Sequence, residues 1–148
     1  MSERASPIGA IDHVAIVVRS IDEALPRYAS LFGLRPAGAV IDLPVQHARV
    51  VFLPTGRRPA ARLELVEPTD DSSGVARFLA TRGEGLHHVC FRSADLPTDL
   101  ATLAAAEAEL IDREPRPGAE GQVAFIHPRT LSGVLWELAA RDVTRDPG

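Results

Sequence analysis

Two histidines and two glutamates stand at corresponding places in the two halves of this 148-residue chain. His88 follows His13 by 75 residues, about half of the chain, and each histidine is followed by a glutamate at nearly the same distance. Glu64 comes 51 residues after His13, and Glu137 comes 49 residues after His88. A repeat of this length is typical of a duplicated structural module. We therefore expect each half to contribute one histidine and one glutamate to a shared site.

The residues that flank these four side chains predict where they point. Each lies among apolar residues in a stretch that reads as a strand, and neighbouring side chains on a strand point to opposite faces. The apolar neighbours can therefore pack beneath a helix, while the histidine or glutamate faces the other way. The four stretches are IDHVAIVV (11–18), ARLELVE (61–67), LHHVCFR (86–92) and VLWELAA (134–140).

Two imidazoles and two carboxylates gathered in one place suit a divalent metal ion. A buried carboxylate is unfavourable by itself, and a shared cation removes that penalty. The ligand set favours Co²⁺, Mn²⁺, Ni²⁺, Zn²⁺ or Mg²⁺, and six-fold coordination leaves two positions for a chelating substrate. A lone strand histidine is more often structural, and a strand glutamate usually lies on a solvated face. Their matched repetition favours the metal, so the predicted ligands are His13, Glu64, His88 and Glu137.

The other three histidines are weaker candidates for the site. His87 aligns with Asp12 in the repeat and not with a histidine. His127 precedes a proline at the end of a predicted strand, so we expect it in a turn or in support of the ligands. His47 has no counterpart and is interpreted as a surface residue.

Elements between the repeated strands complete two similar modules. Apolar residues at helical spacing follow each histidine strand, with Ser20 and Asp95 as the predicted N-caps. Pro26 lies inside the first of these helices and predicts a late start or a kink. Further strands are predicted at 47–53 and 121–127. The predicted fold is α+β, with two tandem βαβββ modules whose eight strands form a cup around the metal.

The predicted boundaries describe one domain over about residues 9–140. The first module covers about 9–68 and the second about 85–140, and they are joined by a helix over about 74–83 that Gly83 ends.

Composition restricts the function further. Hydrophobic residues make up 45% of the chain, which favours a folded domain, and the net charge of −4 gives no support for nucleic-acid binding. No apolar run approaches the roughly 20 residues that span a bilayer, and the N-terminus lacks the apolar core of a secretion signal. We therefore expect a cytoplasmic location and no membrane partner. Cys90 is the single cysteine, which excludes an internal disulfide and a Cys-rich zinc framework.

Three segments resemble the methylmalonyl-CoA epimerase family of the vicinal-oxygen-chelate, or glyoxalase, superfamily. They are IDHVAIVV (11–18), GEGLHHVCF (83–91) and EPRPGAEGQVAFIHP…SGVLWEL (114–138). The resemblance implies the vicinal-oxygen-chelate fold, a divalent metal that is often cobalt, and inversion at C2 of methylmalonyl-CoA. It implies metal-ligand roles for His13, His88 and Glu137, and for Glu64, where relatives have Gln or Glu. The expected partner is an acyl-CoA substrate, and the expected assembly is a homodimer.

The chain departs from this family at several positions. Relatives often have EQG where this chain has residues 45–47, and some carry an acid–base carboxylate where it has Val50. Since valine cannot move a proton, Glu64 and Glu137 become the candidate acid–base pair, with a water molecule as the alternative for one face. In the unusual loop 56–61, Arg57 and Arg58 could bind the phosphates of CoA, but the preferred interpretation of this pair is a solvated basic loop.

Other functions of the same scaffold stay open at this stage. A glyoxalase-I-like isomerase or lyase would use the same four ligands. A non-catalytic protein that binds a small molecule would not need them. A ring-cleaving dioxygenase would favour two histidines and one glutamate with iron.

Overall fold

The computed structural model describes residues 7–57 and 60–141, which group into two compact units. The first unit comprises residues 13–87, and the second comprises the described parts of 1–12 and 88–148. The chain crosses between the units inside strands β1 (Ile11–Val17) and β5 (Gly85–Ser93). Asp12 therefore belongs to the second unit and His13 to the first.

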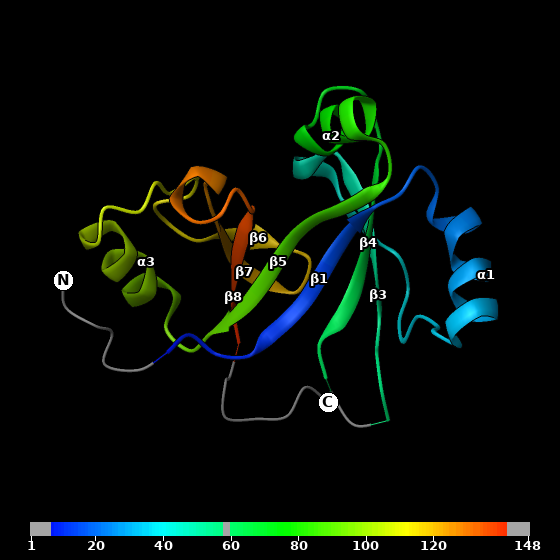
Figure 1. Cartoon of the computed structure of the whole chain (residues 1–148), viewed down its shortest axis with the longest axis horizontal. Coiled ribbons are helices and arrows are strands. Elements are labelled where there is room, and N and C mark those ends of the chain that lie inside the picture. The colour runs from blue at the N-terminus through cyan, green and yellow to red at the C-terminus, as the bar shows by residue number, and fades with distance from the viewer. Residues whose placement is uncertain (1–6, 58–59, 142–148) are drawn as a thin grey trace. The chain divides into compact units, whose positions relative to one another are not determined.

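The first unit contains one βαβββ module followed by a helix (Figure 1). Its strands follow the order β2-β3-β4-β1, in which β1 and β4 are parallel and the other neighbours are antiparallel. After β1 come α1 (Ile21–Phe32), β2 (Ile41–Leu43), the short 3-10 helix η1 (Pro44–Gln46), β3 (Ala48–Leu53), β4 (Arg62–Pro68) and α2 (Gly74–Arg82).

The second unit repeats this arrangement. Its strands follow the order β5-β8-β7-β6, again with the first pair parallel and the others antiparallel. After β5 come α3 (Leu96–Ala105), β6 (Arg116–Gly118), β7 (Gly121–Ile126), the 3-10 helix η2 (Pro128–Thr130) and β8 (Trp136–Ala140). The two predicted βαβββ modules are thus confirmed, whereas the boundaries given for a single domain remain a prediction.

Side-chain caps fix where the helices begin. The Ser20 hydroxyl accepts a hydrogen bond from the Glu23 backbone N–H at 3.2 Å, as expected for an N-cap. Asp95 caps α3 in the same way, and Gly83 ends α2 with a φ of 77°. The predicted late start of α1 is wrong, because the helix begins at Ile21 and continues through Pro26. Pro26 is exposed, so water can satisfy the carbonyl that its missing N–H leaves without a helical partner.

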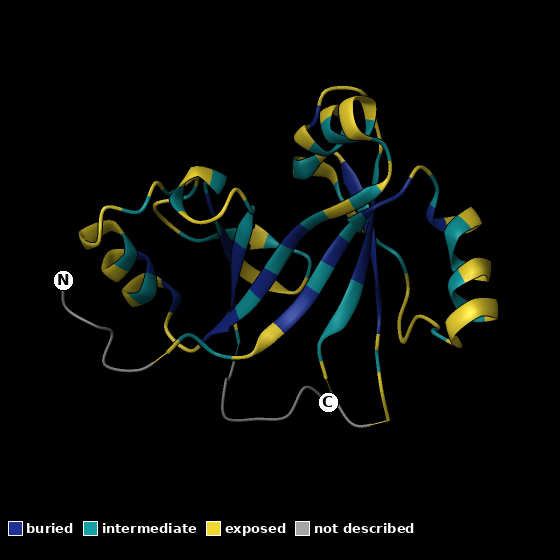
Figure 2. Cartoon of the chain, viewed as in Figure 1, coloured by how far each residue is buried: buried dark blue, intermediate teal, exposed yellow. Residues whose placement is uncertain are grey.

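Each unit packs its helix against one face of its own sheet. In the first unit, Ile21 of α1 packs with Leu53 and Leu65, which are almost fully buried. In the second, Leu100 of α3 packs with Leu138. Figure 2 shows buried residues concentrated in the strands, while the helices are largely exposed on the side away from them. The face of each sheet away from its helix carries the predicted site residues.

None of the helices among the described residues is long and apolar enough to cross a membrane.

Candidate active site

His13 and Glu64 lie next to each other on the face of the first unit's sheet that α1 leaves uncovered. Parallel pairing of β1 with β4 sets Ala15 opposite Glu64, so His13 lies one step along the same face. The His13 Nε2 atom is 3.6 Å from the Glu64 Oε1 atom. Both residues are buried, with 5% and 6% of their surface exposed.

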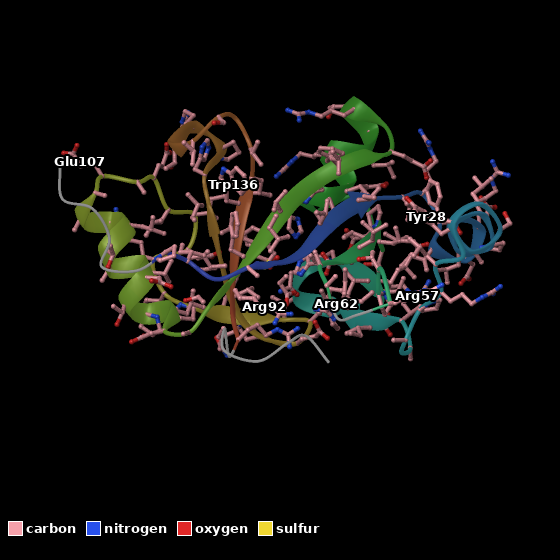
Figure 3. The ribbon with its side chains drawn as sticks, turned by 60° about the horizontal axis from the view of Figure 1, so that its bottom comes forward. Tyr28, Arg57, Arg62, Arg92, Glu107 and Trp136 are labelled. Atoms are coloured by element: carbon pink, nitrogen blue, oxygen red, sulfur yellow. The ribbon has the colours of Figure 1, made fainter. Side chains whose placement is uncertain are left out.

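An aromatic ring and an arginine surround this pair. Phe52 of β3 lies directly opposite Glu64 in the β3–β4 register. Its ring meets the His13 ring edge to face, with 5.3 Å between the centroids. Arg62, labelled in Figure 3, places its guanidinium carbon 4.2 Å from the centre of the Phe52 ring. Stacking of this kind is favourable and holds both side chains in place.

The second unit builds a similar arrangement from strands β5, β6, β7 and β8. The His88 Nε2 atom lies 3.1 Å from the Glu137 Oε1 atom, and both side chains are less than 10% exposed. Phe125 lies opposite Glu137 in the β7–β8 register and meets the His88 ring edge to face at 5.3 Å. The Arg116 guanidinium carbon lies 4.9 Å from the centre of the Phe125 ring. Each unit therefore offers a buried histidine–glutamate pair, a phenylalanine and an arginine.

The chemistry of these pairs fits a divalent cation. Ionised carboxylates at this degree of burial require a counter-charge, and neutral imidazole nitrogens are good ligands for borderline metals. In each unit the nitrogen and the carboxylate oxygen are 3.1–3.6 Å apart, close enough to bind one ion together. Each unit by itself supplies two ligands, which is half of the predicted set.

The remaining histidines take structural roles. His87 packs edge to face against Phe78 of α2, with 5.1 Å between the centroids. His127 caps η2 by accepting a hydrogen bond from the Arg129 backbone N–H, so it is the turn residue that the sequence indicates. His47 is exposed and lies 2.6 Å from the Asp70 carboxylate. Hydrogen bonds from Ser72, together with that from His47, lower the pKa of Asp70 to about 2.

The structure also shows where the residues lie at which this chain departs from the family that it resembles. Val50 is 2% exposed and pairs with Val66 of β4, on the same face as Phe52 and Glu64. Arg57 is exposed in the loop between β3 and β4 (Figure 3). Arg58 lies outside the described residues. Cys90 is fully buried and lies opposite Glu137 in the β5–β8 register.

Sequence reasoning missed a buried ion pair next to the site. Asp12 is 1% exposed, and its Oδ1 atom lies 3.2 Å from Nε of Arg92 and 3.6 Å from Nε of Arg141. Asp12 immediately precedes His13, yet it pairs with residues of the second unit. The only signal in the sequence was an aspartate inside an apolar strand, where a charge requires a partner.

Known proteins resemble the chain over most of its length. A family model described as the Glyoxalase/Bleomycin resistance protein/Dioxygenase superfamily matches residues 12–125. The ethylmalonyl-CoA/methylmalonyl-CoA epimerase of Cereibacter sphaeroides is 34% identical over 134 residues, which are 88% of this chain and 97% of that protein. The chain belongs to the methylmalonyl-CoA epimerase family of the glyoxalase superfamily. A further relative, the uncharacterized protein YqjC of Bacillus subtilis, is 40% identical over 129 residues, 86% of this chain and 89% of that protein.

Solved structures of this family confirm the predicted fold. A methylmalonyl-CoA epimerase in complex with methylmalonyl-CoA and NH4+ matches with a TM-score of 0.85 and 30% identity, covering 95% of this chain and 100% of that one. The epimerase from Mycobacterium tuberculosis matches with a TM-score of 0.86 and 30% identity, covering 95% and 93%. The chain therefore has the vicinal-oxygen-chelate fold. Because epimerases are isomerases, family membership makes it an enzyme of that class.

Proposed function

We propose that this enzyme inverts the configuration at C2 of methylmalonyl-CoA, using one divalent metal ion bound by His13, Glu64, His88 and Glu137. The observation that carries the proposal is the repeated pair, a buried histidine beside a buried glutamate, on the same face of each sheet. Relatives that act on methylmalonyl-CoA by name, at 34% identity over most of the chain, support the choice of substrate.

The metal and the four side chains have separate tasks. When bound, a divalent cation stabilises negative charge on the thioester oxygen of the substrate. His13, Glu64, His88 and Glu137 would hold the ion and would leave room beside it for oxygen atoms of the substrate. Cobalt as the native ion, a homodimeric assembly and a cytoplasmic location remain predictions.

Glu64 and Glu137 are the proposed acid–base pair. The proton next to a thioester carbonyl is only weakly acidic, so a carboxylate could remove it where a bound cation stabilises the resulting negative charge. Inversion then requires that a proton return on the opposite face. One glutamate takes the proton from C2, and the other gives one back. Val50 faces the same side as Glu64 but cannot exchange a proton, so no titratable group stands at that position. A water molecule is the competing donor for one of the faces.

Replacement of Glu64 by glutamine separates ligation from proton transfer. An amide oxygen can still bind the metal, but the amide cannot shuttle a proton. We expect Glu64→Gln to keep its metal and to lose about 10²-fold or more in epimerisation, the usual effect of removing a general acid–base group. Metal content is measured by elemental analysis, and exchange at C2 is followed by NMR in deuterium oxide.

Glu67→Gln is the matched control. Glu67 lies on the same strand but on the opposite face, where its carboxylate accepts hydrogen bonds from the Ile21 backbone N–H and from Arg49. The same chemical change there should leave exchange at C2 within a few-fold of the parent rate. If Glu64→Gln keeps its metal and epimerises as fast as the parent, water or another group serves that face. If the parent enzyme itself catalyses no exchange, the proposed reaction is wrong.

A further inference from the structure

The positively charged guanidinium of Arg116 lies on the same face of the second unit's sheet as the His88–Glu137 pair. Its guanidinium carbon lies 4.9 Å from the Phe125 ring centre, and that ring centre is 5.3 Å from the centre of the His88 ring. The guanidinium is therefore no more than about 10 Å from the imidazole. Val123, which pairs with Arg116 in the β6–β7 register, is on the same face as Phe125.

Asp112 fixes the orientation of this guanidinium. Its Oδ2 atom lies 3.2 Å from Nε of Arg116 and accepts a hydrogen bond from the Phe125 backbone N–H at 2.8 Å. The Asp112 side chain is only 14% exposed, whereas that of Arg116 is 40% exposed. The carboxylate thus contacts Nε of the guanidinium, while the Arg116 side chain as a whole remains accessible to solvent.

This geometry suits a carboxylate ligand. Two parallel amino groups of an arginine match the two oxygens of a carboxylate, and a guanidinium that is already held in place loses little entropy on binding. An acyl-CoA whose thioester lies beside the His88–Glu137 pair would bring its acyl carboxylate to the same face of the sheet as Arg116. The phosphates of CoA lie farther away, because the whole pantetheine arm separates them from the thioester.

We infer that Arg116 binds the free carboxylate of the acyl group and so selects malonyl-type thioesters over neutral acyl-CoA molecules. The inference rests on the proposed function, because it assumes an acyl-CoA beside the histidine–glutamate pairs. Arg116 is a specificity-determining residue, and Asp112 is a positioning residue that acts through it.

Binding measurements test this role without relying on turnover. Metal-loaded protein is titrated by calorimetry with malonyl-CoA, with propionyl-CoA, which lacks the carboxylate, and with free CoA. Arg116→Leu should weaken the binding of malonyl-CoA by about 10- to 100-fold, as expected for lost charge-assisted hydrogen bonds. Binding of propionyl-CoA and CoA should change less than about 3-fold. Arg116→Lys should restore part of the affinity, because it keeps the charge but loses the paired donors.

Arg113→Leu is the matched control, since it removes the same charge from an exposed residue three positions earlier. It should leave all three affinities unchanged. Equal weakening of all three ligands by Arg116→Leu would assign Arg116 to the CoA phosphates and overturn the inference. Unchanged preference for malonyl-CoA in Arg116→Leu would overturn it as well. If the parent protein itself does not prefer malonyl-CoA to propionyl-CoA, the proposed function fails rather than the role of Arg116 alone.

Discussion

The buried Asp12–Arg92 ion pair allows a sharp test of what stabilises the second unit. Asp12 is 1% exposed and the Arg92 side chain 8%, and 3.2 Å separates Oδ1 from Nε. Removing one partner of such a pair leaves a buried charge without its counter-ion, which costs about 3–5 kcal/mol. Asp12→Leu should therefore lower the free energy of unfolding by that amount. For a chain of this length the change corresponds to a fall in melting temperature of about 6–20 °C.

A double variant measures the interaction energy between Asp12 and Arg92 apart from the effect of each side chain alone. Asp12→Leu with Arg92→Met replaces both charges by apolar side chains, and such exchanges are often neutral when volume is kept. We expect the double variant to lose about 1–3 kcal/mol less than the sum of the two single variants. Arg141 also approaches Asp12 but is 29% exposed and pairs with Glu120, so it can return to solvent.

Urea unfolding followed by circular dichroism measures these free energies at one pH and one salt concentration. The pair does not stabilise the fold in this way if the free energy of unfolding of Asp12→Leu stays within about 1 kcal/mol of the parent, or if the effects of the two single changes are simply additive.

Two further predictions concern the paired histidines of β5 and the tyrosine of α1. His88→Ala should lose the bound metal, since one of the four proposed protein ligands is removed. His87→Ala should keep the metal and lose only the packing against Phe78. Elemental analysis of the metal content of both proteins tests this difference. Burial and the Glu84 carboxylate raise the pKa of Tyr28, the single tyrosine of the chain. The absorbance of tyrosinate should therefore appear with a midpoint above pH 10, and Glu84→Gln should lower that midpoint. Because the folded state disfavours tyrosinate, this contribution to stability is present below pH 10 and is lost as the pH rises through the folded-state pKa. An unchanged midpoint in Glu84→Gln would contradict the role of Glu84 in raising the pKa of Tyr28.

Strand parity made the faces of the two sheets predictable from the sequence. Alternation around Glu64 and Glu137 predicts that their leucine neighbours pack beneath a helix, and Leu65 and Leu138 do so. The caps at Ser20 and Asp95 were equally readable, because a capping side chain acts within its own turn. Local patterns of this kind need no knowledge of distant residues.

Structural features that depend on residues far apart in the sequence could not be predicted from local patterns. Strands β2 and β6 have only three residues each, too few to show a period, and form by pairing with β3 and β7. The late start predicted from Pro26 is wrong because the penalty of a missing N–H depends on exposure, which the sequence does not state. The stacking of Arg62 and Arg116 on phenylalanine rings is likewise a tertiary contact.

The two arginines differ in a way that the proposed reaction can use. The histidines, glutamates and phenylalanines repeat at nearly constant offsets, because they occupy equivalent strands of the two modules. Arg62 belongs to β4, whereas Arg116 belongs to β6, so these two do not correspond. An epimerase needs equivalent chemistry on both faces of one carbon, yet it must tell the carboxylate from the thioester. Repeated glutamates serve the first need. The second is served by Arg116 of β6, because the corresponding strand of the first module, β2, carries no arginine.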